Sequence, residues 1–458
     1  MKQIVIDPTT GRERHAFDAL DASARDAAID RAQTSYKEWR GKSFDERATL
    51  LERVAAVMRD DRERLARLMT DEMGKPIREA RGEVDKAAWC AEHYARHAAG
   101  YLEREMIASD ALLSYVQYLP IGPVLGILPW NAPFWLAFRF AAPALMAGNT
   151  CLMKHDAHVP GCARAIEECF TAAGAEPGIF QNLPLDTADI EGAITHPAIR
   201  AVSFTGSDRA GAIVAATAAG QIKPAVLELG GSDPVIVLAD ADLDRAADVV
   251  TLSRIINAGQ SCIAAKRIIV ERPVYEPFLE KLRARLEKLQ VGDPAEETTD
   301  VGPIARADLR DNLHRQVLAS VEAGARCLLG GALPEGPGFF YPPTLLADVT
   351  DEMAAFCEET FGPIATALPA DDAETALQIA NDTPYGLGAS IWTADTAQAI
   401  AMAARIEAGQ VAINGIVKTD PRLPSGGVKR SGYGRELGPH GIRMFVNAQQ
   451  VWVGAPTG

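Results

Sequence analysis

The sequence predicts an α/β protein built on two mainly parallel sheets. From about residue 124 onward, short apolar runs typical of strands alternate with amphipathic segments typical of helices. This rhythm favours parallel strands, because each parallel pair needs a crossover connection. The chain has 458 residues, 48% of them hydrophobic, which is enough for two or three domains with their own cores.

The elements are expected in a simple order. Residues 17–108 are predicted to be helical, because apolar side chains recur there at steps of three and four residues, with Gly74-Lys75-Pro76 as a stop signal. The predicted strands cover residues 124–128, 150–153, 202–205, 226–229, 235–238 and 268–270. The predicted helices cover residues 134–147, 161–173, 208–218, 241–257, 274–290, 306–323, 372–381 and 395–407, the last with Gly409 as its C-cap.

Two strand-like segments, 112–119 and 446–453, fall outside this rhythm. An isolated strand pair exposes its edges and tends to find a partner sheet. The two segments therefore predict an oligomerisation flap, and a surface hairpin on a monomer is the alternative.

Charge and cysteine content exclude several classes of protein. A net charge of −15 repels polyanions, so neither nucleic acid nor an anionic membrane is an expected partner. Residues 111–138 carry no formal charge, but four prolines within them argue against a membrane span. Seven cysteines without a C-x-x-C pair are typical of a reducing compartment, and the start of the chain has no apolar leader. We expect a cytoplasmic enzyme or binding protein.

The standard metal and nucleotide motifs are missing from the sequence. His93 and His97 lie one helical turn apart but have no third ligand, so no metal site is predicted and a solvated or interface face is expected there. There is no G-x-G-x-x-G segment either.

Cys262 is the strongest candidate for a catalytic residue. It follows Gly259-Gln260-Ser261 at a helix-to-strand junction, where a thiol can face a cleft, and a thiolate there would attack a carbonyl carbon. The other six cysteines are expected to be small buried hydrophobic residues.

Two polar residues in apolar settings complete the candidate site. Glu228 ends an apolar strand before Gly230-Gly231, where desolvation would raise its pKa enough for it to take a proton from water. A salt-bridged strand end is an equally favoured alternative. Asn131 lies between two prolines and could donate its amide to an oxyanion, or it could be a helix N-cap.

These residues belong to a larger ordered set of motifs. The set comprises Pro129-Trp130-Asn131, Lys154, Phe204-Thr205-Gly206-Ser207, Glu228-Leu-Gly-Gly, Gly259-Gln-Ser-Cys262, Glu359-Thr-Phe361-Gly-Pro, Asn381-Asp-Thr-Pro-Tyr-Gly-Leu and Gly426-Gly-Val-Lys-Arg-Ser-Gly-Tyr-Gly-Arg-Glu436. In order and spacing it resembles the aldehyde dehydrogenase superfamily, over nearly the whole chain.

The resemblance implies a subunit with three parts. An atypical Rossmann-like coenzyme domain takes residues 1–111 and 121–227, an α/β catalytic domain takes 228–437, and a β oligomerisation flap combines 112–120 with 438–458. A homodimer or homotetramer is expected. The implied coenzyme-binding residues are Trp130, Lys154, Ala157, Gly206, Ser207, Glu359 and Phe361.

The matched residues also imply a mechanism. Cys262 would attack an aldehyde, and the Asn131 amide and the Cys262 backbone N–H would hold the oxyanion. Hydride would pass to the nicotinamide of NAD or NADP, with Glu359 on its ribose and Phe361 beside the ring. Glu228 would then activate the water that hydrolyses the thioester on Cys262.

Two departures from the family pattern bear on specificity. Many NAD-preferring relatives carry a ribose-binding glutamate three residues after the lysine, where this chain has Ala157. This favours NADP, with Asp156 as the residue that could favour NAD. Ser425 replaces the phenylalanine of a common Pro-Phe-Gly-Gly motif, which should widen or polarise the substrate pocket.

A finer resemblance concerns the substrate. Phe138-Arg139-Phe140, Cys262-Ile-Ala-Ala-Lys-Arg267 and Asp420-Pro-Arg-Leu-Pro424 resemble bacterial succinate-semialdehyde dehydrogenases, particularly an NADP-using branch. Arg139 is the only formal charge between Asp110 and Lys154, and a buried guanidinium needs a partner, so we predict that it binds a substrate carboxylate. An internal salt bridge is the alternative.

Other functions compete with this one. An aldehyde dehydrogenase for another aromatic or aliphatic aldehyde would share every motif. A cysteine-dependent esterase or thioesterase would use Cys262 and Glu228 but would not need the dinucleotide-site motifs. A non-catalytic protein on this fold is disfavoured, because nucleophile, base and oxyanion donor are all present.

Overall fold

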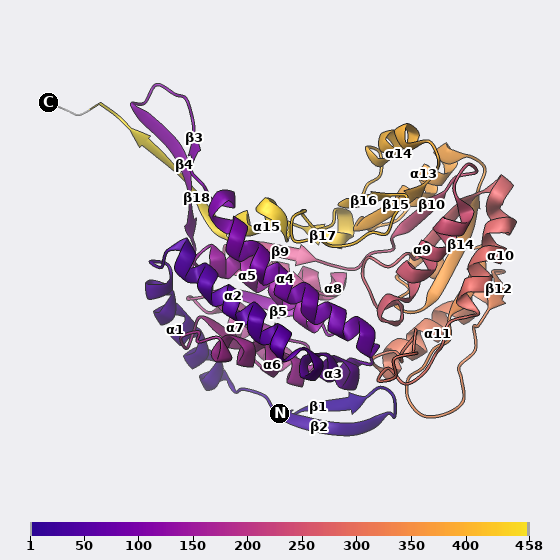
Figure 1. The fold of residues 1–458 in the computed structure, drawn as a ribbon, viewed down its shortest axis with the longest axis horizontal. Coiled ribbons are helices and arrows are strands. Elements are labelled where there is room, and N and C mark those ends of the chain that lie inside the picture. The colour runs from indigo at the N-terminus through magenta and orange to yellow at the C-terminus, as the bar shows by residue number, and fades with distance from the viewer. Residues whose placement is uncertain (1, 456–458) are drawn as a thin grey trace.

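A computed structural model describes residues 2–455 and confirms the α/β class. Two α/β units lie side by side, and a slender β flap projects from one of them near the C-terminus (Figure 1). The units are a six-stranded and a seven-stranded sheet with their covering helices.

The N-terminal region combines a hairpin with a helical layer. Strands β1 (Lys2–Asp7) and β2 (Arg12–Asp18) pair antiparallel. Four helices follow, α1 (Ala22–Trp39), α2 (Phe44–Asp60), α3 (Arg62–Met73) and α4 (Ile77–Tyr101). The prediction of helices over 17–108 is therefore correct only from 22 to 101, because backbone pairing takes up both of its ends.

Local signals set the ends of two of these helices. Ser43 and Glu46 form a reciprocal capping box at the start of α2. Gly74, with φ of 76°, ends α3 in the left-handed conformation, as the stop signal predicted.

The six-stranded sheet has the order β17-β9-β8-β5-β6-β7, and only β17 runs antiparallel to its neighbour. Its strands are β5 (Val124–Leu128), β6 (Cys151–His155), β7 (Phe180–Asn182), β8 (Ala201–Thr205), β9 (Ala225–Glu228) and β17 (Gly432–Tyr433). The connecting helices are α5 (Pro133–Met146), α6 (Pro160–Ala172), α7 (Ile190–Thr195), preceded by the 3-10 turn η1 (Thr187–Asp189), and α8 (Asp208–Gly220).

Alternating side chains of this sheet enter two different cores. On β5, Val124 and Leu128 belong to the core with α2 to α6, whereas Leu125 and Ile127 belong to the core with α1, α7 and α8. Because helices cover both faces, the open place for a ligand is beyond the carboxyl ends of the strands.

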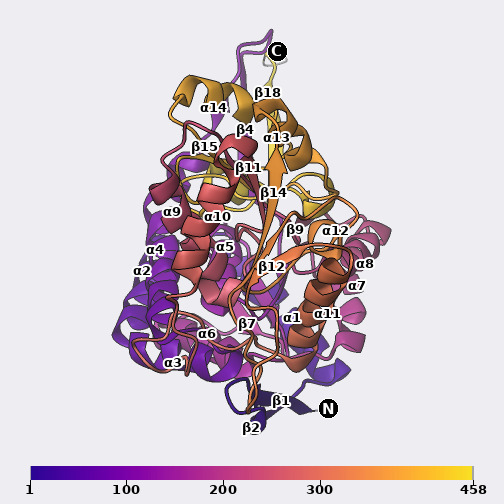
Figure 2. The ribbon, with the colours of Figure 1, turned by 90° about the vertical axis from the view of Figure 1, so that its right-hand side faces the viewer.

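The seven-stranded sheet has the order β12-β13-β14-β11-β10-β15-β16, parallel except for β12. Its strands are β10 (Pro234–Val237), β11 (Arg267–Glu271), β12 (Arg326–Leu329), β13 (Thr344–Ala347), β14 (Ile364–Ala370), β15 (Gly388–Trp392) and β16 (Gln410–Ile413). Its helices are α9 (Leu243–Ile255), α10 (Tyr275–Leu286), α11 (Ala307–Glu322), α12 (Ala354–Cys357), α13 (Ala373–Asn381) and α14 (Thr396–Ala403), with 3-10 turns η2 (Ile256–Gly259) and η3 (Arg272–Val274). A further 3-10 turn, η4 (Lys429–Ser431), leads into β17 of the six-stranded sheet. Figure 2 looks onto this unit, with α10 and α11 toward the viewer.

Three predicted helix ends are wrong, and the first is that of α10, which ends at Leu286 and not at residue 290. Helix α14 ends at Ala403, and Gly409 is not its C-cap but the residue before β16, where a Cβ would collide with the carbonyl of Gly426. The predicted helix over 241–257 splits at Ile256, where the chain leaves the α conformation.

The flap is a three-stranded antiparallel sheet, β18-β4-β3. Strand β4 (Leu113–Pro120) pairs over its whole length with β18 (Val446–Val453), which follows α15 (Gly438–Arg443), and β3 (Glu105–Met106) adds a short edge. The two strand segments predicted outside the α/β rhythm therefore pair with each other. Met1 and residues 456–458, at the ends of the predicted coenzyme domain and flap, lie outside the described residues.

Within residues 2–455, no helix is both long and apolar enough to cross a bilayer. The same residues contain no group of three or more side chains placed to hold a metal ion.

Candidate active site

A pocket of about 730 Å³ is lined by residues of both units, a size typical of small-molecule sites. It brings together most of the residues predicted from the sequence: Trp130, Asn131, Arg139, Gly206, Ser207, Glu228, Cys262, Glu359 and Phe361. Lys154, Ala157 and Ser425 lie outside its lining.

Cys262 reaches the pocket through a strained segment of backbone. Asn257, Ala258 and Gly259 all have left-handed conformations, with φ of 56°, 53° and 75°. This is costly for an alanine, and at Gly259 a Cβ would collide with the carbonyl of Gly362. The strain lies just before the thiol, at the turn from η2 toward β11.

A buried lysine fixes the same loop. The ammonium of Lys266 donates to the carbonyls of Ser261 (3.0 Å) and Cys262 (2.6 Å) and forms an ion pair with Glu359 (3.0 Å). Burial raises the pKa of the Cys262 thiol to about 11, and the charges of Lys266 and Arg139 oppose that rise. The two cations therefore favour the thiolate, which is the nucleophilic form.

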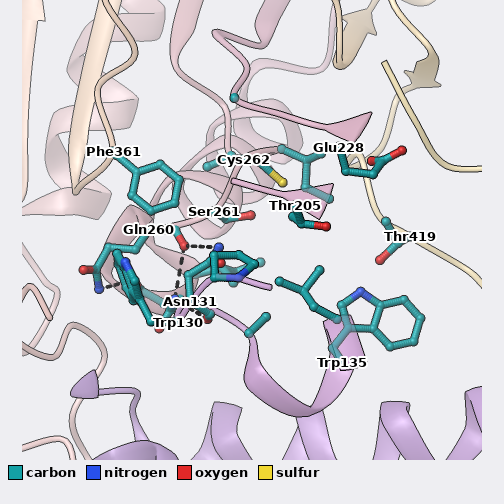
Figure 3. Close-up of a pocket in the computed structure, with 18 of the residues that line it drawn as sticks. Trp130, Asn131, Trp135, Thr205, Glu228, Gln260, Ser261, Cys262, Phe361 and Thr419 are labelled. Carbon is teal, nitrogen blue, oxygen red and sulfur yellow. Dashed lines mark hydrogen bonds between the residues drawn. The ribbon is translucent and has the colours of Figure 1, made fainter. Parts of the chain in front are cut away.

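Asn131 is an amide donor and not a helix cap. Its Nδ2 donates to the carbonyl of Gln260 (3.1 Å), which leaves its second amide hydrogen free for another acceptor (Figure 3). The main-chain carbonyl of Asn131 accepts from Asn257 Nδ2 and from Lys75 Nζ, both at 2.9 Å. The amide is thereby held at the pocket wall.

The N-terminus of α5 is capped by another residue. Ala132 occupies the N-cap position, and Glu83 on α4 accepts hydrogen bonds from the backbone N–H groups of Phe134 (2.9 Å) and Trp135 (3.2 Å). The N-cap alternative for Asn131 is therefore wrong.

Glu228 lies in the salt bridge of one interpretation, and its role as a base remains a prediction. Its Oε2 lies 3.2 Å from a guanidinium nitrogen of Arg139, whereas its Oε1 is buried and has no hydrogen-bond partner among residues 2–455. Burial raises the pKa of Glu228, and the nearby Glu436 carboxylate adds to the rise, while Arg139 opposes it. One oxygen is thus part of a salt bridge, and the other can accept a proton.

Arg139 has internal partners. Its Nε lies 2.6 Å from a carboxylate oxygen of Glu436, and another of its nitrogens contacts Glu228. This is the internal salt bridge of the alternative interpretation, so the guanidinium does not need a substrate to neutralise it. A contact between Arg139 and the substrate remains a prediction, but the need of a buried guanidinium for a partner no longer supports it.

Ser425 lies behind Arg139, with only 2% of its surface exposed. Its hydroxyl is 3.4 Å from both Arg139 and Gln410, and its backbone exchanges two hydrogen bonds with Glu436. A direct contact of Ser425 with a substrate remains a prediction, and this position favours a role in holding Glu436.

Several predicted coenzyme residues converge at one end of the pocket. The rings of Trp130 and Phe361 meet edge to face at 5.9 Å, and Glu359 accepts a hydrogen bond from the backbone of Gly231 (3.2 Å). The hydroxyl of Ser207 caps α8. The N-terminus of a helix suits the binding of a phosphate.

The end of β6 carries the residues predicted to select the coenzyme. Burial lowers the pKa of Lys154, and the charges of Asp156 and Asp186 offset part of this effect. Asp156 accepts hydrogen bonds from the backbone and the ring of His158, the latter at 2.7 Å. Despite burial, which raises it, these bonds lower the pKa of Asp156 to about 2. Ala157 adds no charge beside it.

The sequence alone suggested no role for several residues of this site, among them Lys86, Thr205, Gln260 and Glu436. Glu436 stands in the Gly-Tyr-Gly-Arg-Glu motif, and Gln260 and Thr205 stand in two others, so the motifs contained a signal for all three. Lys86 lies on a helix in a polar stretch of sequence, and nothing there distinguishes it from a solvated lysine.

Comparison with known proteins identifies the family of this chain and several similar proteins. The aldehyde dehydrogenase family matches residues 1–451. The chain is 47% identical to a probable NADP(+)-dependent succinate-semialdehyde dehydrogenase of Synechocystis sp. over 98% of this chain and 99% of that protein. It is 44% identical to an NAD(P)+-dependent succinate semialdehyde dehydrogenase of Escherichia coli, over 98% and 97%. The crystal structure of succinic semialdehyde dehydrogenase from Streptococcus pyogenes in complex with NADP+ is 36% identical, with a TM-score of 0.97 over 99% of this chain and 100% of that chain.

Proposed function

The chain belongs to the aldehyde dehydrogenase family, and from this premise we propose that it oxidises succinate semialdehyde to succinate with NADP+ as electron acceptor. One observation carries the proposal. A single pocket contains a thiol, a carboxylate with an unpaired oxygen and a free amide hydrogen, which are the nucleophile, base and oxyanion donor that the reaction requires.

The pocket also suits a dinucleotide. Thr205 Oγ1, at the end of β8, is buried and has no hydrogen-bond partner in the part of the chain that the structure describes. At the next residue, Gly206, a Cβ would lie 2.7 Å from the ring of Phe204, so the backbone stays bare where a phosphate can approach. Lys154, Ser207, Glu359 and Phe361 would hold NADP+, which accepts a hydride when bound.

The first step belongs to Cys262. The thiol loses its proton to solvent, favoured by Lys266 and Arg139, and the sulfur then bonds to the aldehyde carbon. The carbonyl electron pair moves to the oxygen, where the amide of Asn131 stabilises the charge. Departure of hydride from that carbon leaves a thioester on Cys262.

The second step belongs to Glu228. Its unpaired Oε1 takes a proton from a water molecule, and the resulting hydroxide attacks the thioester carbon. The carbon–sulfur bond breaks, the acid leaves, and Cys262 returns as thiolate. Burial favours this role because it raises the pKa of Glu228.

NADP+ rather than NAD+ is the proposed acceptor. Lys154 can pair with a 2′-phosphate, Ala157 adds no carboxylate to repel it, and the Asp156 carboxylate is engaged by His158. The relatives named for NADP(+) support the same choice.

Assembly and location are part of the proposal. Leu112, Leu113 and Trp452 on or beside the flap expose 67%, 42% and 53% of their surfaces, which supports a homodimer or homotetramer formed through the flap. The free cysteines support a cytoplasmic location.

A panel of aldehydes with and without a terminal carboxylate, assayed with NADP+ and NAD+ separately, tests the function. We expect the highest kcat/KM with succinate semialdehyde and NADP+. Release of acid or alcohol from esters without formation of reduced coenzyme from any aldehyde would instead identify a hydrolase.

A further inference from the structure

The cations that line the pocket differ in what neutralises them. Lys75 pairs with Glu83, and Arg139 pairs with Glu228 and Glu436. Lys86 has no carboxylate within ion-pair distance among residues 2–455, although it is half-buried.

The carboxylates nearest to Lys86 are already engaged by other partners. Glu83 binds Lys75 with one oxygen and caps α5 with the other. Asp420 is held by two nitrogens of Arg422, at 2.8 and 2.6 Å. The positive charge of Lys86, at the wall of the pocket, is therefore not neutralised by these carboxylates.

The ammonium of Lys86 has room for one more ligand. It donates one hydrogen bond to Thr419 Oγ1 at 2.8 Å and lies 4.2 Å from the centre of the Trp135 ring, a cation–π contact. An ammonium has three hydrogens, so one is free for an acceptor in the pocket.

This place is the far end of the pocket from the coenzyme residues. Figure 3 shows Trp135 and Thr419 on one side, Trp130 and Phe361 on the other, and Cys262 between the two groups. A substrate whose aldehyde carbon is at Cys262 and whose chain runs away from Phe361 would lead its other end toward Trp135 and Thr419.

The electrostatics favour an anion there. Burial lowers the pKa of Lys86 to about 8, and the like charge of Arg139 adds to this effect, while Glu83 and Asp420 oppose it. A bound carboxylate would offset both the burial and the repulsion.

We propose that Lys86, together with the Thr419 hydroxyl beside the Trp135 ring, binds the terminal carboxylate of the substrate and selects for acidic aldehydes. This rests on the proposed function, and it assigns the specificity to a lysine of α4. Arg139 then serves mainly to position Glu228.

Kinetics of Lys86→Met test the proposal, since methionine keeps the length of the side chain without its charge. We expect the ratio of kcat/KM for succinate semialdehyde to that for butanal to fall about 10- to 100-fold, mainly through KM. Lys86→Arg should retain most of the ratio. The matched control is Lys37→Met, at an exposed lysine of helix α1 outside the pocket lining, which should leave the ratio unchanged.

The outcomes separate the two proposals. A normal enzyme that prefers succinate semialdehyde, with an unchanged ratio in Lys86→Met, would overturn the role of Lys86 and leave the function standing. Equal kcat/KM for both aldehydes in the normal enzyme would overturn the proposed substrate itself.

A pH profile of the unmodified enzyme tests the proposal without a variant, so the result does not depend on whether a variant folds. Deprotonation of Lys86 should lower the ratio of kcat/KM for succinate semialdehyde to that for butanal above about pH 8. Titration of Cys262 and Glu228 changes kcat/KM for both substrates alike, so it cancels in this ratio. The titratable groups facing Lys86 are Glu83 and Cys90 on α4, Arg139 on α5 and Asp420. A ratio that stays flat from pH 7 to pH 10 would overturn the proposal.

Discussion

The pocket has an inner region around Arg139 and an outer region around Lys86, and the two treat a buried cation differently. At Arg139, two carboxylates of the chain balance the charge, and the group is almost fully buried. At Lys86, a hydroxyl and an aromatic ring surround the charge without balancing it. The proposal for Lys86 rests on this difference in internal counter-charge and not on residue type.

The two regions also differ in what a substitution would expose. Removing one member of a buried pair leaves an unpaired charge, so changes in the inner region should disturb stability and every substrate together. Removing an unbalanced charge should alter only those substrates that supply the missing anion.

The largest expected effect lies in the inner region, at the nucleophile. Cys262→Ala should lower oxidation of every aldehyde by more than about 10³-fold, because the covalent bond can no longer form. NADP+ binding, measured by calorimetry, should persist, since most coenzyme residues belong to the other unit. The expectation that the other six cysteines are buried is wrong for Cys327 and Cys357, whose side chains are exposed. Cys327→Ala is therefore the matched control and should keep normal rates. Appreciable turnover by Cys262→Ala would contradict the assignment.

The next effect sharpens the contrast between the two cations. Arg139→Met should lower kcat/KM for succinate semialdehyde and butanal to a similar extent, because Glu228 and Glu436 lose their shared counter-charge. The free energy of unfolding should fall by about 3–5 kcal/mol. Arg139→Lys should recover part of the lost kcat/KM and part of the lost stability. A loss confined to succinate semialdehyde would instead establish Arg139 as the carboxylate-binding residue.

The smallest expected effect is at the coenzyme end. Ala157→Glu should lower the ratio of kcat/KM with NADP+ to that with NAD+ by about 10-fold or more, because a carboxylate there repels a 2′-phosphate. Ala157→Gln has nearly the same shape without the charge and should change the ratio much less. An enzyme whose unmodified form already prefers NAD+ would contradict the premise and direct attention to Asp156.

Much of the fold could be predicted from sequence, since its signals are local. The apolar strand 124–128 and the stop at Gly74 are found as predicted. Strand β2, by contrast, is a polar segment that forms through pairing with β1. Strand β16 is an edge strand that follows Gly409, which the sequence pattern predicted as a helix C-cap. Long-range pairing of this kind leaves little trace in local periodicity.

The candidate site also contains residues that local motifs predict and contacts that only the folded chain reveals. Cys262, Glu228 and Asn131 stand in recognisable motifs, and the structure brings all three to one pocket. The partners of Arg139 and the isolation of Lys86 could not be predicted, because they depend on Glu436 and Thr419, which lie some 300 residues away along the chain. Burial and pairing of charges are properties of the folded chain.

The most direct test of the account is to trap the acyl group on the enzyme. Glu228→Gln, mixed with succinate semialdehyde and NADP+, should complete one hydride transfer and stop, because only deacylation needs the base. The predicted result is a stoichiometric burst of NADPH and, by mass spectrometry of the quenched protein, one succinyl group on Cys262. A burst that leaves Cys262 unmodified, or the absence of any burst, would contradict the division of labour between Cys262 and Glu228.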